Sequence, residues 1–193
     1  CALPIFSIFV SRPTNLSPSQ RQSLDLVFRQ LRSLQLEPVA LGSSDYPDEF
    51  PLREAHVLAR HCSGGVLLGF EQYSAKAVTK VGANGRRVMK GSVSFPTPWN
   101  QLEAGILFGL GLPLVIFREE GIRGGVFDEG VTDVFVHSMP PSPLTATERR
   151  PLKEVFLKWH AKVLDRYYRR KHGSASARER AQVRAVPAPL TTH

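Results

Sequence analysis

The sequence predicts an α/β protein with a three-layer, flavodoxin-like (Rossmann-like) parallel sheet of about five strands and helices on both faces. Short apolar runs alternate along the chain with longer segments in which apolar residues recur every three or four positions. The 193 residues are 42% hydrophobic, with a mean hydropathy of −0.15, which suffices for the core of one ordinary domain.

The first strand and the first helix are predicted from the N-terminal residues. An apolar run over 4–10 is typical of a buried parallel strand, and a turn-rich loop over 11–17 follows it. Ser17, Pro18 and Gln20 have the spacing of a capping box with proline at the first helical position. The apolar face of the helix that follows consists of Leu24, Val27, Phe28, Leu31 and Leu34.

Two more strands and a second helix follow. Residues 36–41 read as a strand and 42–50 as a polar loop. A helix begins at Pro51 and ends near His61. The uncharged run over 65–70 is then the third strand of the sheet.

Residues 71–98 interrupt this alternation. They contain the turn sequence GANGRR between two β-rich stretches, which predicts a hairpin or a flexible loop inserted after the third strand. A helix over 99–110 and a strand over 112–117 resume the pattern. A glycine-rich loop over 118–130 and a last strand over 131–137 complete the sheet.

A long helix over 145–172 follows a proline-rich linker. Proteins of this fold often pair through helices, so this helix is a candidate surface for a homo-oligomer. We assign residues 1–172 to one α/β domain. Residues 173–193, rich in Ser, Ala, Arg and Pro, are expected to form a basic disordered tail.

The net charge of +8 is concentrated in two segments. Residues 71–98 carry five lysines and arginines against Glu71, and residues 165–193 carry seven against Asp165 and Glu179, so the rest of the chain is nearly neutral. Such segments attract polyanions without sequence preference, although most charged tails are simply solvated. Nucleic acid is therefore expected as a partner only nonspecifically, through the basic tail.

Topology alone predicts where a ligand binds. In open parallel sheets, ligands lie at the carboxyl ends of the strands, where the winding direction reverses. The loop after the first strand offers Ser11, Arg12 and Pro13, and an arginine there can hold phosphate or carboxylate, or simply lie in a surface turn. After the third strand, Gly69 permits close approach of a ligand, and Phe70 either stacks on a base or covers the core edge.

Glu103 is the residue on which the functional reading depends. Asn100 as N-cap with Glu103 three residues later has the form of a capping box, which explains Glu103 without chemistry. Alternatively, a carboxylate kept ionised near a helix N-terminus attacks an anomeric carbon or stabilises the cation that forms there. Trp99 is suited to a pocket wall, and Gly105 and Gly109 to close packing of the helix on the sheet or on a ligand.

Three stretches carry a resemblance to a known group of proteins: FSIFVSRP, CSGGVLLGF and TPWNQLEAGILFGLGLPLVIF. Together they resemble the nucleoside 2-deoxyribosyltransferase-like group and the related TIR-like nucleotide-binding folds, over roughly residues 4–120. In those transferases the glutamate of an E-x-G step is the nucleophile, and Glu103-Ala104-Gly105 matches that step. The resemblance implies a nucleoside, nucleotide or dinucleotide ligand, and cleavage or transfer at a ribosyl carbon.

The sequence departs from that group where base and sugar are gripped. The transferases usually carry aspartates after the third strand and before the glutamate, whereas here LLGFEQ and FPTPWNQ contain none. The nearby acids are Glu71, Glu119, Glu120 and Asp128. We include Glu119 and, at the start of the helix, Asn100 among the candidate ligand-binding residues. The basic insertion beside this site is interpreted either as a lid for phosphates or as a plain solvated loop.

Two hypotheses therefore stand side by side. In the first, the chain is an enzyme that cleaves or transfers an N-glycosidic bond, with Glu103 as nucleophile or cation stabiliser. In the second, it is a non-catalytic binding module of the same fold that senses a nucleotide-derived signal. The missing aspartates favour the second, and the retained E-x-G step favours the first. A third hypothesis, a nucleic-acid-associated protein acting through its tail, ranks below both.

Several classes of site are not expected. The six histidines and two cysteines show no metal-ligand spacing, so neither a metal nor a cofactor is predicted. No P-loop, dinucleotide-binding glycine motif or G-x-S-x-G elbow is present. No apolar run reaches the length of a membrane helix, and the cysteine content suits a reducing compartment, so we expect a cytoplasmic protein that does not enter membranes.

Overall fold

The computed structural model describes residues 6–41, 50–83, 85–89 and 91–184. Its centre is a five-stranded parallel sheet with the strand order β2-β1-β3-β8-β9. The strands are β1 (Phe6–Ser11), β2 (Leu36–Val39), β3 (Gly64–Gly69), β8 (Leu114–Arg118) and β9 (Val136–Ser138). The predicted flavodoxin-like α/β fold is confirmed.

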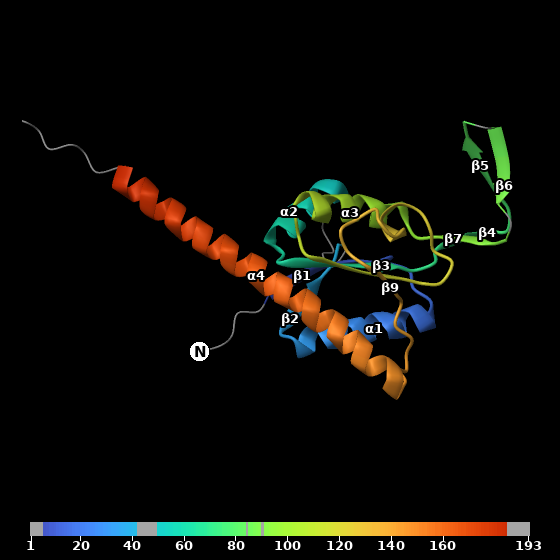
Figure 1. Ribbon diagram of the computed structural model, residues 1–193, viewed down its shortest axis with the longest axis horizontal. Helices are drawn as coiled ribbons and strands as arrows, with labels where there is room; N and C mark the ends of the chain where they lie inside the picture. The colour runs from blue at the N-terminus through green and yellow to red at the C-terminus, as the bar shows by residue number, and fades with distance from the viewer. Residues whose placement is uncertain (1–5, 42–49, 84, 90, 185–193) are drawn as a thin grey trace, which may run out of the picture.

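Helices cover both faces of this sheet (Figure 1). The helices are α1 (Pro18–Ser33), α2 (Pro51–His61), α3 (Pro98–Gly109), α4 (Ala146–Arg184) and the short 3-10 helix η1 (Gly125–Phe127). One apolar cluster joins α1 and α4 to one face of the sheet, and a second joins α2 and α3 to the other. The structure is thus three-layered.

Two adjacent glycines of β3 allow helices to approach the sheet closely from opposite faces. A Cβ at Gly64 would lie 2.8 Å from the Val163 side chain of α4. A Cβ at Gly65 would lie 2.9 Å from the Leu107 side chain of α3. Real Cβ atoms do not come this close, so the Gly-Gly step sets how tightly the three layers pack.

The start of α1 is as predicted. Ser17 is its N-cap, and its Oγ accepts a hydrogen bond from the Gln20 backbone N–H at 3.3 Å. The Gln20 Oε1 in turn accepts from the Ser17 backbone N–H at 3.0 Å, which completes the capping box. The local sequence therefore fixes where the chain leaves the loop after β1.

Several predicted boundaries shift. The last strand is β9, only Val136–Ser138 instead of 131–137, and the segment before it consists of bends. Helix α4 runs beyond the expected end near His172 to Arg184, so residues 173–184 are helical where a disordered tail was expected. Ala, Arg, Glu and Gln are good helix formers, and Gly173 alone costs only about 1 kcal/mol, which explains the extension. Residues 42–49 of the predicted loop and residues 185–193 lie outside the described residues.

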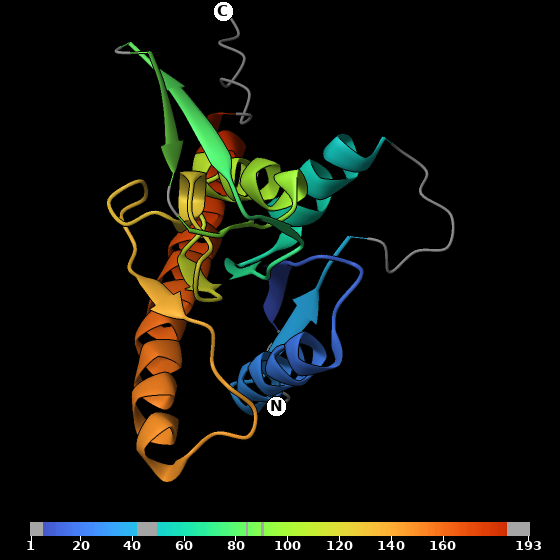
Figure 2. The same cartoon turned by 90° about the vertical axis from the view of Figure 1, so that its right-hand side faces the viewer.

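The insertion forms two successive antiparallel ribbons, as the hairpin prediction requires. Strands β4 (Tyr73–Ala75) and β7 (Val93–Phe95) pair at its base, and β5 (Val78–Gly82) and β6 (Gly85–Met89) pair beyond them. Figures 1 and 2 show the β5–β6 ribbon projecting from the body of the protein. None of the described helices is long and apolar enough to cross a membrane.

The glycines of α3 do not face the sheet. A Cβ at Gly105 or Gly109 would meet no atom within 4 Å, and both residues are exposed. The expectation that they bring the helix close to the sheet is wrong, because the close approach is made at Gly65 on β3. The outward surface of α3 consists instead of apolar residues, among them Leu102, 47% exposed, and Phe108, 51% exposed.

Two glycine-to-alanine substitutions are expected to have opposite effects. A Cβ at Gly69 would lie 2.7 Å from the fully buried Phe127 ring, so Gly69→Ala should destabilise the fold by roughly 1–3 kcal/mol. Gly105→Ala removes a flexible residue from an open helix position and should stabilise by up to about 1 kcal/mol. Urea denaturation of both variants measures this, and equal effects would contradict the packing at Gly69.

Candidate functional site

The candidate site lies where the winding of the sheet reverses. Strands β1 and β3 are parallel neighbours, with Val10 opposite Val66 and Ser11 opposite Leu67. The chain leaves β1 toward α1 on one face, and α3 covers the other face. In sheets of this kind the carboxyl ends of two such strands border the ligand crevice.

A buried hydrogen-bond network connects three elements at this point. Asn100 of α3 and Ser11 of β1 are 1% and 0% exposed. The Asn100 Nδ2 donates to Ser11 Oγ at 2.8 Å and, at 3.5 Å, to the Leu68 carbonyl of β3. The Thr97 hydroxyl donates to Asn100 Oδ1 at 2.9 Å. The network holds the start of α3 against the ends of β1 and β3.

Glu103 does not belong to a capping box. Thr97 is the N-cap of α3, and Pro98 occupies the first turn. Asn100 is therefore inside the helix, where its side chain points to β1 instead of capping. Glu103 follows one turn later, and it is buried, with 6% of its surface exposed. The capping interpretation is wrong, because both Thr97 and Asn100 suit an N-cap and the chain uses the earlier one.

The Glu103 carboxyl has an altered acidity. Burial raises the pKa of Glu103 from 4.5 to about 7, while a hydrogen bond from Ser11 and the charge of Arg12 both lower it. The expectation that the helix N-terminus keeps this carboxylate ionised is not met, because desolvation outweighs the other effects. Near neutral pH both the ionised and the protonated form of this carboxyl are therefore populated, which suits acid–base and nucleophilic chemistry.

Arg12 lies beside this carboxyl with part of its hydrogen-bonding capacity unused. Its Nη1 donates to the Pro13 carbonyl at 3.1 Å. Its Nε is buried and has no hydrogen-bond partner among the described residues. A buried donor without an acceptor costs free energy, so this arginine is suited to accept an anionic group from a ligand. Pro13 is buried directly after it.

Gly69 and Phe70 are packed within the protein core. Phe70 is 0% exposed and packs in the apolar cluster of α1 and α4. The space above Gly69 is filled by the Phe127 ring of η1. Of the two interpretations of Phe70, the core one is confirmed. The interpretation that Gly69 admits a ligand is wrong, because η1 packs there.

Glu119 connects three parts of the fold. One of its oxygens, Oε2, accepts from the Gln20 Nε2 of α1 at 2.9 Å and from the Glu71 backbone N–H. The Gln20 amide also donates to the Glu71 carbonyl at 3.0 Å. The described hydrogen bonds of Glu119 thus join its carboxylate to α1 and to the loop after β3, and they position that loop. Sequence reasoning missed Gln20 as its partner, because capping alone explained that residue.

Trp99 and Gln101 lie on the outer part of α3. Trp99 is 45% exposed and free to contact a ligand or another molecule. Gln101 was not singled out from the sequence, yet it fastens the glycine-rich loop to α3. Its Nε2 donates to the Gly124 carbonyl at 3.2 Å, and its Oε1 accepts from the Val126 backbone N–H at 2.9 Å. No local pattern marks such a glutamine, because its partners are distant in the sequence.

A cavity of about 890 Å³ opens at the carboxyl ends of β8 and β9. Arg118 and Arg123 line it together with a larger number of acids. The acids are Glu119, Glu120, Asp128, Glu129 and Glu148. This excess of negative charge disfavours a phosphate.

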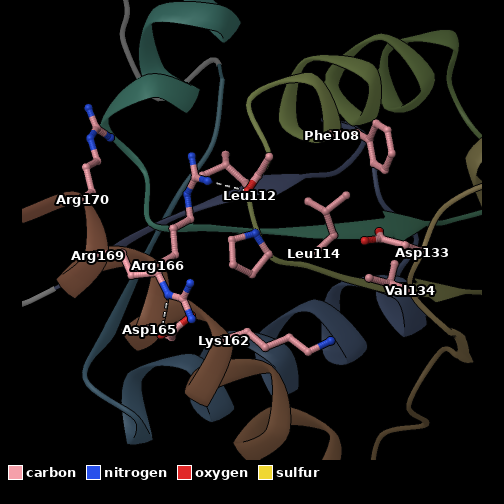
Figure 3. A pocket seen from close by; sticks show the side chains of 12 residues that line it. Phe108, Leu112, Leu114, Asp133, Val134, Lys162, Asp165, Arg166, Arg169 and Arg170 are labelled. Atoms are coloured by element: carbon pink, nitrogen blue, oxygen red, sulfur yellow. Dashed lines mark hydrogen bonds and ion pairs between the residues drawn. The ribbon is translucent and has the colours of Figure 1, made fainter. Parts of the chain in front are cut away.

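A second cavity, of about 740 Å³, lies at the opposite, amino-terminal edge of the sheet (Figure 3). Its three arginines have partners within the fold. Arg166 donates to the Leu110 and Gly111 carbonyls at the end of α3, and Arg169 pairs with Asp165 at 2.9 Å. Arg170 donates to the Arg60 carbonyl near the end of α2. Arg166 and Arg170 of α4 therefore stabilise the C-terminal ends of α3 and α2.

Other reactive groups are structural. Cys62 is a free, buried thiol whose pKa burial raises to about 12, so it is a poor nucleophile. Within the described ranges, no three His, Cys, Asp or Glu side chains are arranged to hold a metal ion. Cys1 lies outside the described residues.

No family model matches the chain, and no curated protein gives a significant match to it.

The pKa of Glu103 makes stability depend on pH. Because its folded-state pKa of about 7 exceeds the ordinary 4.5, its stabilising contribution is complete below pH 4.5 and lost as the pH rises through 7. Glu103→Gln lacks this dependence. Between pH 4.5 and 7, the unfolding free energy of Glu103→Gln should therefore rise relative to that of the wild type by on the order of 3 kcal/mol. Urea denaturation from pH 4.5 to 8 tests this, with the exposed Glu120→Gln as control. Parallel pH profiles for wild type and Glu103→Gln would contradict it.

Proposed function

We propose that the chain binds a nucleoside or nucleotide and cleaves or transfers its N-glycosidic bond, with Glu103 as the reacting carboxylate. The observation that carries this proposal is the buried Glu103 carboxyl, with a pKa near 7, between Ser11 and Arg12 at the carboxyl ends of β1 and β3. A carboxyl is costly to bury without an ion pair, and groups of this kind concentrate in active sites.

The reaction follows from the chemistry of a carboxylate facing a ribosyl carbon. A Glu103 oxygen attacks the anomeric carbon while the bond to the base nitrogen breaks, and that bond's electron pair leaves with the base, which takes up a proton. Water or a second base then displaces Glu103 from the glycosyl ester. If attack is incomplete, the same carboxylate stabilises the oxocarbenium-like cation.

The surroundings of Glu103 support both parts of this reaction. The Ser11 hydrogen bond and the Arg12 charge favour the ionised form that attacks, and burial makes that form more reactive by removing water. Arg12 supplies a partly unused guanidinium for a phosphate or another anionic group. Trp99, half exposed at the start of α3, is a surface on which a base can stack.

A substrate panel with matched variants tests the assignment. Wild type, Glu103→Gln and Glu120→Gln are incubated with nucleosides, deoxynucleosides, mononucleotides and NAD, and free base is quantified by chromatography. We expect base release by wild type and Glu120→Gln, and a loss of at least 1,000-fold in Glu103→Gln, because the nucleophile is removed. The rate should rise with pH up to about 7, since Glu103 must be ionised. Turnover that survives Glu103→Gln would disprove the role of Glu103.

The second candidate function is a non-catalytic module that senses a nucleotide-derived signal. It is favoured by the absence of aspartates after β3 and before α3, and by the small exposed fraction of Glu103. A ligand from the same panel that raises the melting temperature of wild type and Glu103→Gln alike, without base release, would establish this function instead.

Arg12 gives an independent prediction about the ligand. Arg12→Gln removes a positive charge from beside Glu103, so the pKa of Glu103 and the pH midpoint of activity should rise. Affinity for a nucleotide should fall by roughly 10-fold or more, while affinity for the matching nucleoside changes little. Calorimetric titration of both ligands measures this, with the exposed Arg21→Gln as control. An equal loss for both ligands would rule out phosphate recognition by Arg12.

A further inference from the structure

The projecting ribbon formed by β5, β6 and their turn is strongly basic and contains no acid. No aspartate or glutamate occurs between Glu71 and Glu103, whereas five lysines and arginines do. Three of these, Lys80, Arg86 and Arg87, are exposed residues of β5 and β6. These cations lie on paired strands and are separate from the basic residues of α4.

The ribbon stands in solvent without a layer packed on it. Thr79 to Gly82 and Gly85 to Val88 are exposed, and Val81 and Val88 are 68% and 63% exposed. Both views of the molecule show it directed away from the sheet (Figures 1 and 2). A two-stranded ribbon alone is only marginally stable in water, so a surface that covers it would stabilise it.

The strand register places like charges opposite each other. Lys80 pairs directly with Arg87, and like charges at such positions destabilise a ribbon. Lys80, Arg86 and Arg87 take part in none of the ion pairs of the described residues. An anionic partner would turn this repulsion into attraction.

The cations occupy both faces of the ribbon. Directly paired residues share a face, so Lys80 and Arg87 lie on one face, and Arg86, paired with Val81, lies on the other. The pairing of the two strands extends to Gly82 and Gly85 at the far end of the ribbon. A flat anionic surface can contact only one face of a ribbon, whereas a groove bordered by negative charge on both sides can contact both faces.

We propose that this ribbon inserts into the major groove of duplex DNA, where its cations contact the phosphates of both strands. The major groove of B-form DNA is wide enough for a two-stranded ribbon, whereas that of A-form RNA is too narrow and deep. Cations on both faces match the two phosphate backbones that border the groove. The contacts are to phosphates, so binding does not depend on base sequence. This inference is independent of the reaction assigned to Glu103.

Titration of a fluorescein-labelled 20-base-pair DNA duplex tests the proposal by anisotropy at several salt concentrations. Each cation that contacts a phosphate contributes about 0.9 to the slope of log affinity against log salt. Lys80→Ala, Arg86→Ala and Arg87→Ala should therefore each lower that slope by about one. The charge-reversed double variant Lys80→Glu/Arg87→Glu should bind at least 10-fold more weakly than Arg21→Glu/Arg29→Glu, which makes the same charge change at exposed positions of α1.

Each other outcome overturns the proposal. Equal losses in the two double variants would mean that only net charge matters. A slope that responds to Arg86→Ala but not to Lys80→Ala and Arg87→Ala, or the reverse, would indicate a flat surface. Tighter binding of duplex RNA, or of vesicles rich in phosphatidylserine, would assign the ribbon to that partner instead. Circular dichroism of each variant verifies that the fold is retained.

Discussion

The reversal of winding between β1 and β3 is the constraint on which the candidate site depends. It leaves the carboxyl ends of two buried strands beside the first turns of α3, where backbone carbonyls and polar side chains are withdrawn from water. Buried polar groups must be paired, and Asn100 does this by joining Ser11 and the Leu68 carbonyl. The position of α3 relative to the sheet is thus fixed by the network that also places Glu103. A packing requirement and a functional arrangement share the same residues.

Opposing effects of the fold hold the pKa of Glu103 close to neutral pH. Desolvation alone would keep the carboxyl protonated, and a close ion pair would keep it ionised. Ser11 and Arg12 supply an intermediate influence, so the pKa is about 7. Because Arg12 retains an unused buried donor, a ligand that binds it also changes the charge beside Glu103. For the anionic ligand that we propose, binding and ionisation of the carboxyl would therefore be coupled through one guanidinium.

The sequence was sufficient for features with short-range causes. The alternating apolar segments predict the parallel sheet, Ser17 with Gln20 predicts the start of α1, and the turn within GANGRR predicts the ribbon. It was insufficient where two local patterns compete or where contacts are distant. Thr97 and Asn100 both suit an N-cap, and only the partner on β1 decides between them. The burial that raises the pKa of Glu103 likewise comes from packing against the sheet, which no spacing within α3 reveals.

The distribution of charge separates two regions of the surface. Five acids line the cavity at the carboxyl ends of β8 and β9, so an anionic group cannot approach the site favourably from that side. The positive charge that lowers the pKa of Glu103 is that of Arg12, directly after β1, so the phosphate of the proposed ligand would lie toward β1 and α1. The basic ribbon leaves the body through β4 and β7, away from the sheet, as Figure 1 shows. The two proposed ligands, a nucleic acid at the ribbon and a small phosphorylated molecule beside Arg12, would therefore occupy different parts of the protein, with the acids of the cavity disfavouring either one there.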